Sequence, residues 1–288
     1  MKIVKLISKT AALFAFAITL GTCQSVPGIV TEPAVSFESV SLTGINFSGT
    51  DMAARIRIQN NNSFAIPFPE INWDFHVSGA SFLSGIIGNN TRIAARGYTT
   101  VELPFTVSYE GLFRTVAGLL TADEAPYRLE LAARFPMPLL DDIIISTSFD
   151  GSLPLLRAPA LSFDGMRFNS LSLSRIEFVL TWQLDNRNVF PVNLDKLGFN
   201  FAVNNVSWSS GSVENISLAA RQVTQIPVTV GIESFAMIQE IVTLAAAGRT
   251  VNFVSSGEIS LSPQGFANVT TAAFSRPFHF SGSTTLRP

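Results

Sequence analysis

The sequence contains a single cysteine, Cys23, and only two histidines among its 288 residues. One cysteine cannot form an intramolecular disulfide, so the folded protein must be stable without one. Charged residues make up only 14% of the chain, the net charge is -2, and no basic cluster follows Lys9. Because phosphate binding requires concentrated Lys and Arg, we expect no nucleic-acid partner.

Apolar residues are abundant where charge is scarce. They make up 47% of the chain, and phenylalanine occurs 24 times against three tyrosines. This composition allows a large hydrophobic core and differs from that of disordered chains. Beyond the N-terminal leader no apolar run is long enough to span a bilayer, which predicts a body that is anchored to a membrane rather than embedded in it.

The N-terminus has the pattern of an exported protein. Lys2, Lys5 and Lys9 precede the uncharged run Thr10–Leu20. This arrangement is typical of a secretory signal peptide, and the apolar run is too short for a membrane span. Cys23 follows almost directly after this run, at the place where such a peptide is cut.

The segment Leu20-Gly21-Thr22-Cys23 resembles the lipobox of bacterial lipoproteins. The resemblance implies that the Cys23 thiol accepts a diacylglycerol, that the chain is cut before Cys23, and that acyl chains hold the mature protein in the bacterial cell envelope, at the periplasmic face or in the outer membrane. Thr22 departs from the Gly, Ala or Ser that the pattern favours. The alternative is a plain signal peptide that ends near a cysteine.

Four segments occur twice in the same order, about 125 residues apart, which indicates a tandem duplication. The pairs are Pro33–Glu38 with Pro159–Asp164, Ile71–Phe75 with Leu197–Phe201, Ala94–Arg96 with Ala219–Arg221, and Pro104–Val107 with Pro227–Val230. The predicted division is a lipoprotein signal peptide at 1–22, a tether at 23–32, a first domain at 33–153, a linker at 154–158 and a second domain at 159–286.

Apolar residues within each repeat mostly alternate with polar ones, which is the period of a β-strand. Ile71, Trp73, Phe75 and Val77, for example, share one face of such a strand. Many short amphipathic strands favour a fold in which the apolar faces of two sheets pack together. We therefore predict a mainly β protein of two tandem antiparallel β-sandwich domains, similar to immunoglobulin or fibronectin type III domains.

One segment in each repeat has helical spacing instead, which predicts one helix inserted between the strands of each domain. The first is Tyr109–Thr121, and its apolar face is formed by Leu112, Val116, Leu119 and Leu120. The second is Glu233–Ala247, and its apolar face is formed by Phe235, Ile238, Ile241, Val242 and Ala245. Gly248 is the expected C-cap of the second helix.

Asparagine-rich turns between strands carry a resemblance to a known family. The segments are Arg57–Pro67 (RIQNNNSFAIP) with Trp73–Gly79, and Trp182–Pro191 (WQLDNRNVFP) with Gly198–Asn205. Their order resembles the water stress and hypersensitive response (WHy) domain of atypical late embryogenesis abundant proteins and their bacterial relatives, some of them tandem. The central Pro of the family's Asn-Pro-Asn is missing from both copies, which retain asparagine at Asn61 or Asn62 and at Asn186.

The turn residues that this resemblance singles out are Asn60, Asn61, Asn62, Asp185 and Asn186. Asparagine tolerates left-handed backbone and bonds to its own chain, so it suits the sharp exit from a strand. We therefore interpret these residues as structural. The alternative is a role in binding a ligand.

The sequence offers few groups for catalysis. His76 and His279 lie in alternating strands without cysteine or clustered carboxylates nearby, so we expect no metal site. The acidic pairs Asp123-Glu124 and Asp141-Asp142 border turns and are interpreted as solvated loop charges. No phosphate loop, nucleophile elbow or dinucleotide fingerprint is present. We expect a protein that is not an enzyme and binds no cofactor.

Three functions fit these observations. The WHy resemblance implies a non-catalytic protein that protects client proteins or membranes during desiccation or other stress. A structural lipoprotein that acts as a spacer or scaffold for envelope proteins is the second. A carrier that holds a small apolar ligand between its sheets is the third. The sequence does not fix the client, the ligand or the oligomeric state.

Overall fold

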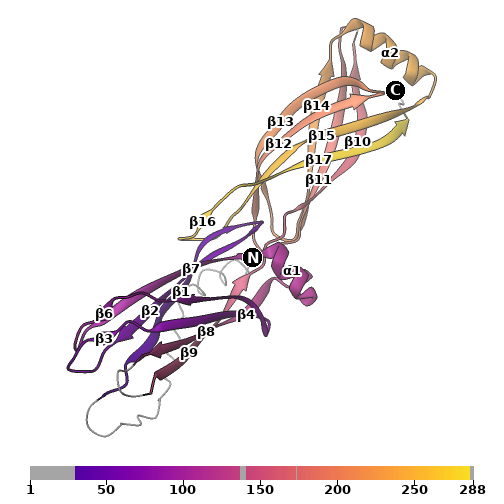
Figure 1. The fold of residues 1–288 in the computed structure, drawn as a ribbon. Helices are drawn as coiled ribbons and strands as arrows, with labels where there is room; N and C mark the ends of the chain where they lie inside the picture. The colour runs from indigo at the N-terminus through magenta and orange to yellow at the C-terminus, as the bar shows by residue number, and fades with distance from the viewer. Residues whose placement is uncertain (1–29, 137–140, 173, 286–288) are drawn as a thin grey trace, which may run out of the picture.

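The computed structural model describes residues 30–136, 141–172 and 174–285 (Figure 1). Cys23, the predicted signal peptide and the tether up to residue 29 lie outside the described residues. Strands cover most of the described chain, together with two α-helices and one 3-10 helix. The prediction of a mainly β protein is confirmed.

The first half of the chain forms two main sheets. One has the order β1-β2-β7 and the other β5-β4-β8-β9, while β3 and β6 form a short separate pair. Neighbouring strands in these sheets are antiparallel. The strands are β1 Ala34–Asn46, β2 Gly49–Gln59, β3 Ile66–Pro67, β4 Glu70–Val77, β5 Ala80–Ile87, β6 Arg92–Ile93, β7 Tyr98–Ser108, β8 Glu124–Phe135 and β9 Ile143–Pro154.

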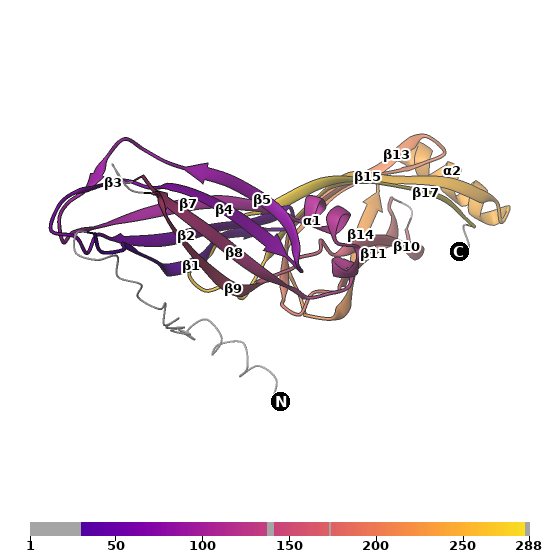
Figure 2. The same cartoon turned by 60° about the horizontal axis from the view of Figure 1, so that its bottom comes forward.

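The second half has sheets of the order β10-β11-β14 and β13-β12-β15-β17. These orders are the same as in the first half when strands are matched by their place in the chain. The strands are β10 Ala160–Leu171, β11 Ile176–Asn186, β12 Val192–Val203, β13 Val206–Leu218, β14 Gln222–Ile232, β15 Thr250–Pro263, β16 Thr270–Thr271 and β17 Phe274–Thr285. Figure 2 shows the two halves one after the other along the molecule.

Alternating burial follows the alternating sequence. In β2 the side chains of Met52, Ala54, Ile56 and Ile58 are buried, and the residues between them are not. Aromatic rings join the two sheets of each half: the Phe75 ring in β4 lies 4.9 Å from that of Phe105 in β7. In the second half the ring centroids of Trp182 in β11 and Phe199 in β12 are 4.8 Å apart.

Proline stands at matched positions in the edge strands β7 and β14. Pro104 lies opposite Ala53, and Pro227 lies opposite Thr181. Each of these strands ends its sheet, so the missing N–H of proline costs no ladder hydrogen bond there. The same absence hinders a further strand from pairing with these edges.

The first helix is shorter than predicted. α1 spans Tyr109–Thr115 and is followed by the 3-10 helix η2, Ala117–Leu120. Val116, with φ -126°, separates the two, so the apolar residues do not share one helical face. Leu112 and Leu119 are buried, but Leu120 is 56% exposed, and its predicted place on a buried face is wrong.

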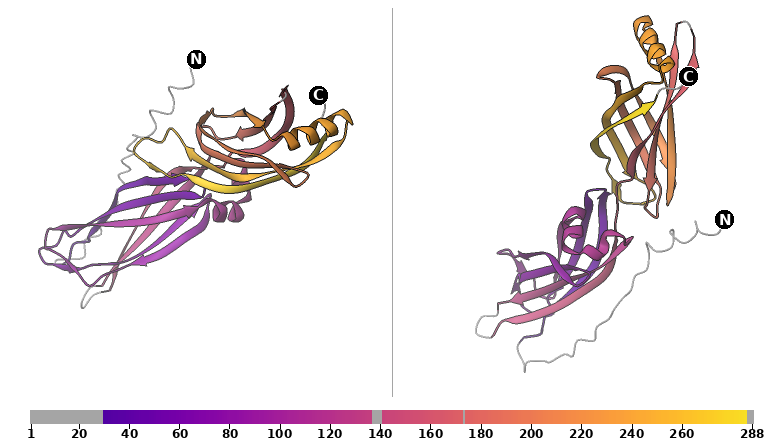
Figure 3. Two further views of the ribbon diagram at one scale, coloured as in Figure 1. Left: turned by 90° about the horizontal axis from the view of Figure 1, so that it is seen from above. Right: turned by 90° about the vertical axis from the view of Figure 1, so that its right-hand side faces the viewer.

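The second helix, α2, spans Phe235–Ala246, which lies within the predicted segment and ends one residue before its predicted end. The C-cap is Ala247, and Gly248 follows it in the left-handed region, with φ +57°, so glycine ends the helix as expected but lies one position beyond the cap. Ile238 and Ile241 are buried as expected. Phe235 is 66% exposed, because α2 lies at the free end of the second half and no element covers it from outside (Figure 3).

The second half reaches back to the first through β16. This short strand pairs parallel with the end of β1, with Gly44 opposite Thr270. The amide N–H of Ala272 donates to Ile45 O at 3.3 Å, and the rings of Phe47 and Phe274 lie 6.1 Å apart. Residues of the two halves therefore share a contact surface in the middle of the molecule (Figure 1).

Candidate functional site

The buried side chain of Asn60 joins neighbouring backbone segments at one end of the first half. Its Nδ2 donates to the backbone oxygens of Phe64, Ile93 and Ala94, at 2.7, 3.2 and 3.0 Å. Its Oδ1 accepts from both the backbone N and Nδ2 of Asn62. Asn60 is fully buried, so this amide satisfies backbone groups that water cannot reach.

Asn62 extends this network to the chain that enters β1. Its Oδ1 accepts from the backbone N of Thr31 at 2.6 Å, and its Nδ2 donates to Thr31 O at 2.7 Å. The side-chain amide thus pairs with Thr31 as a neighbouring strand would. We call Asn60 and Asn62 the first clamp, because they hold the entering chain to the turn after β2.

Asn186 and Asn188 form a second clamp with the same bonds. Asn186 Nδ2 donates to the backbone oxygens of Phe190, Leu218 and Ala219, and its Oδ1 accepts from Asn188. Asn188 pairs with the backbone of Arg157, accepting at 2.9 Å and donating at 2.7 Å. These asparagines are also buried.

The clamps differ from the residues that the sequence singled out. Asn61 and Asp185 belong to neither clamp: Asn61 is only partly buried and makes one 3.3 Å bond to Glu32 O, and Asp185 pairs with Arg187. Asn188 was missed, although the spacing Asn-x-Asn is the same as in the first clamp. The expected left-handed backbone is absent from the clamp residues as well, because their role is hydrogen bonding by the side chain.

The second clamp fixes the chain between the halves. The backbone of Arg157 is held by Asn188, and its Nη2 donates hydrogen bonds to Leu119 O, at 2.8 Å, and to Ala122 O. Its Nε is buried without a hydrogen-bond partner among the described residues, and burial lowers the pKa of the guanidinium. Arg157 therefore connects the second clamp to the end of the first half.

An ion pair crosses the same junction. Arg221 Nη2 lies 2.5 Å from Asp123 Oδ2, although the two residues are 98 positions apart. The backbone of Arg221 is left-handed, with φ 58°, and its N–H donates to Asn188 O. The interpretation of Asp123 as a solvated loop charge is therefore wrong. Asp142 is likewise paired, with Arg134.

Tyr109 lies at the junction end of the first half and is buried. Its hydroxyl bonds to Thr50 Oγ1 at 2.5 Å and donates to Pro154 O at 2.9 Å. Burial raises the pKa of Tyr109 to about 12. In the unfolded chain a tyrosine titrates near pH 10, so this group stabilises the fold fully below about pH 10 and loses that contribution as the pH rises through about 12.

Tyr109→Phe is therefore expected to be less stable than wild type at pH 7, by about 1 kcal/mol for the lost hydrogen bonds. Its stability should also fall less steeply between about pH 10 and 12, because phenylalanine has no proton to lose. Urea unfolding midpoints across this range check the prediction. Tyr98→Phe, at a side chain that is 59% exposed, is the control. Parallel curves for Tyr109→Phe and wild type contradict the prediction.

The histidines lie apart from this junction. His76 Nε2 lies 3.3 Å from Asp74 Oδ2 and 3.7 Å from Glu130 Oε2 on the outer face of the first half. His279 lies in β17, opposite Ser256. Among the described residues, no group of three His, Cys, Asp or Glu side chains could hold a metal ion.

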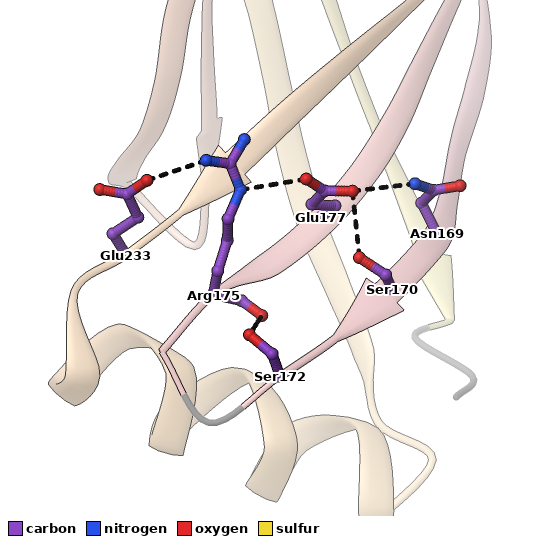
Figure 4. A network of polar contacts seen from close by, with 6 residues as sticks. All are labelled: Asn169, Ser170, Ser172, Arg175, Glu177 and Glu233. Atoms are coloured by element: carbon purple, nitrogen blue, oxygen red, sulfur yellow. Dashed lines mark hydrogen bonds and ion pairs between the residues drawn. The ribbon is translucent and has the colours of Figure 1, made fainter.

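A chain of polar contacts lies beside α2 at the free end of the second half (Figure 4). Arg175 pairs with Glu233 at 2.9 Å and with Glu177 at 3.0 Å. Glu177 also accepts from Ser170 and Asn169, and these hydrogen bonds lower its pKa. Arg175 therefore pairs with both carboxylates, and the three side chains together carry one net negative charge.

A shallow cavity of about 640 Å³ lies at the opposite end of the molecule. Phe68 and Ile86 line it together with the ion pair between Arg134 and Asp142. A mixed lining of this kind differs from the mostly apolar pockets that hold small apolar ligands.

Residues 55–147 match the family described as "Late embryogenesis abundant protein". The chain contains an LEA-like domain. The match runs from within β2 to within β9 and includes the first clamp. Similar curated proteins are the "Probable desiccation-related protein LEA14" of Arabidopsis thaliana, 25% identical over 44% of this chain and 83% of its own length, and the "Desiccation-related protein PCC27-45" of Craterostigma plantagineum, 26% identical over 46% and 86%.

Two solved structures are also similar to part of this chain. A solution structure from Arabidopsis thaliana is 23% identical, covers 45% of this chain and 88% of its own, and has a TM-score of 0.36. The structure of an Archaeoglobus fulgidus protein is 16% identical, covers 42% and 98%, and has a TM-score of 0.26. Within the part of the chain that the structure describes, no helix has the length and apolar character needed to cross a bilayer.

Proposed function

We propose that this is a lipid-anchored protein of the bacterial cell envelope with two tandem WHy-like β-sandwich domains. It acts without catalysis and protects proteins or membranes during desiccation or other stress. The observation that carries the stress role is the LEA-like match over residues 55–147, together with the desiccation-related relatives.

The proposal of a second WHy-like domain rests on the internal repeat. The family match covers only the first half, but the second half has the same strand order and the same clamp. Such a pair of buried asparagines is unlike a catalytic arrangement, since every amide group is used to hold backbone. The clamps therefore support a structural role for the family's asparagines in both domains.

Protection by contact requires apolar surface that a partly unfolded protein can cover. Ile86 in β5 and Ile144 in β9 are 67% and 64% exposed on the outer face of their sheet. Edge pairing through β7 or β14 is disfavoured by Pro104 and Pro227. The proposed protective surface is therefore this sheet face rather than the edges at β7 and β14.

Drying a labile enzyme with the purified mature protein tests the stress role. We expect more recovered activity than with an equal mass of albumin, and less protection from the Ile86→Ser/Ile144→Ser variant. Phe235→Ser, which removes an equally exposed side chain at the other end, is the matched control. Protection no better than that of albumin contradicts the proposal.

The lipid anchor has its own test. Cys23→Ser removes the only thiol that can accept a diacylglycerol. We expect the variant to leave the membrane fraction or to accumulate with its signal peptide uncut, while the wild type carries acyl chains by mass spectrometry. Unchanged membrane association of the variant contradicts the anchor.

A structural spacer is the second candidate, and the junction favours it. Arg157 and the Asp123–Arg221 ion pair tie the halves together, which suits a protein that must hold a fixed length. Crosslinking in cells distinguishes the two functions: one dominant stoichiometric partner favours the spacer, and a diffuse set of clients favours protection.

A further inference from the structure

The end of the molecule that carries the first clamp has an arginine that corresponds to Arg221 at the junction. Arg96 and Arg221 are matched: both are left-handed, with φ 53° and 58°, and both donate their N–H to the second asparagine of a clamp. The Arg221 side chain forms an ion pair with Asp123, which belongs to the first half. The Arg96 side chain is exposed and has no ion pair or hydrogen bond among the described residues.

An aromatic and a second basic residue lie at the same end as Arg96. Phe64, in the clamp turn, is 41% exposed. Arg92 is also exposed and donates only to a backbone oxygen, Ala65 O. Arg134 is neutralised by Asp142, and Glu32 and Glu70 share this end. This end therefore has no strong net charge, but it presents two arginines that have no acidic partner in the described part of the chain, together with an exposed aromatic ring.

The length of the chain that precedes Thr31 indicates what this end faces. The first clamp holds Thr31, and Cys23 precedes it by eight residues. Eight residues span at most about 29 Å even when fully extended. β3 and β6, next to the clamp, lie at the opposite end of the molecule from α2 (Figure 1). A lipid on Cys23 thus keeps the clamp end near the bilayer.

We propose that Phe64, Arg92 and Arg96 form a surface that rests on the phospholipid headgroups of the membrane holding Cys23. Arginine pairs with phosphate oxygens through its planar fork of donors, and a phenylalanine ring inserts at the boundary between headgroups and acyl chains. The phosphate takes the place that Asp123 has beside Arg221. The molecule then stands on its clamp end and presents α2 away from the bilayer. This inference rests on the proposed lipid anchor.

The test uses the lipid-modified protein in phosphatidylcholine vesicles that contain phosphatidylglycerol and a quencher lipid. A fluorophore is attached to Ser63→Cys, beside Phe64, or to Ala247→Cys, after α2; both positions are exposed and the acylated Cys23 does not react. We expect quenching at position 63 and none at 247. Mass spectrometry first establishes that the sample carries acyl chains.

Charge reversal identifies the contact. Arg92→Glu/Arg96→Glu is expected to lower the population quenched at position 63 by about tenfold or more, given the attraction of each arginine to an anionic surface. Arg249→Glu, at an exposed arginine beside α2, is the matched control and should change nothing.

Each other outcome overturns the inference. Equal quenching at both positions means that the molecule lies flat, and no quenching at position 63 in acylated protein means that the tether holds it clear of the bilayer; both leave the lipid anchor intact. Cys23 without acyl chains overturns the anchor itself, and the inference falls with it.

Discussion

Asn186→Ala is expected to lower the free energy of unfolding by about 3 kcal/mol. The substitution removes the donor of three backbone oxygens, those of Phe190, Leu218 and Ala219, and the acceptor of Asn188. Asn186 is fully buried, so water cannot replace these partners without opening the turn. Urea unfolding followed by tryptophan fluorescence and by circular dichroism measures the loss.

The same change in the first clamp, Asn60→Ala, should cost a similar amount, because Asn60 makes the same set of bonds. Asn61→Ala is the matched control: its side chain is only partly buried, and we expect a change within about 0.5 kcal/mol. Equal losses at Asn60 and Asn61 contradict the role assigned to the clamp.

Asn186→Asp separates the hydrogen bonds from the packing. Aspartate has almost the same shape, but its carboxylate faces three carbonyl oxygens where the amide donated. We expect a greater loss than for alanine at neutral pH, since the oxygen that replaces Nδ2 faces carbonyl oxygens without a donor, although Asn188 still donates to the other oxygen. The repulsion raises the pKa of the new carboxyl. The loss of stability relative to wild type should therefore become smaller at acidic pH, where the carboxyl is protonated.

The strands and helix positions could be predicted because they depend on local spacing. The alternation of Ile71, Trp73, Phe75 and Val77 is a property of seven consecutive residues, and the structure places Ile71, Phe75 and Val77 in the core. The helix after β7 was also located, but its break at Val116 was missed. That break is a change of backbone conformation at Val116, with φ -126°, which the apolar pattern does not show.

The clamp and the junction required partners that lie far away in the sequence. Asn62 is 31 residues from Thr31, and Asp123 is 98 residues from Arg221. No local pattern identifies either partner. The repeat could have identified Asn188, because aligning Asn60-x-Asn62 with the second copy places Asn186 and Asn188 at equivalent positions. The family motif does not show this pair, because its central proline is missing from both copies.

Arg157→Ala is expected to release the fixed arrangement of the two halves while each half stays folded. Arg157 gives the first half two hydrogen bonds, at Leu119 O and Ala122 O, from a backbone position that Asn188 holds. Alanine leaves both oxygens without this donor, and the Asp123–Arg221 pair that remains is partly exposed and therefore weak. The two halves should then sample a range of angles.

Small-angle X-ray scattering measures this change as a broader distribution of interatomic distances, and energy transfer between dyes on the two halves measures it as a broader range of efficiencies. Arg249→Ala, which removes an exposed arginine with no side-chain partner among the described residues, controls for the loss of charge. Adding Asp123→Ala to Arg157→Ala should broaden the distribution further, because the crossing ion pair is then lost as well. An unchanged distribution in the double variant would mean that β16 and the Phe47–Phe274 contact alone fix the junction. The spacer function would then depend on that apolar contact rather than on Arg157.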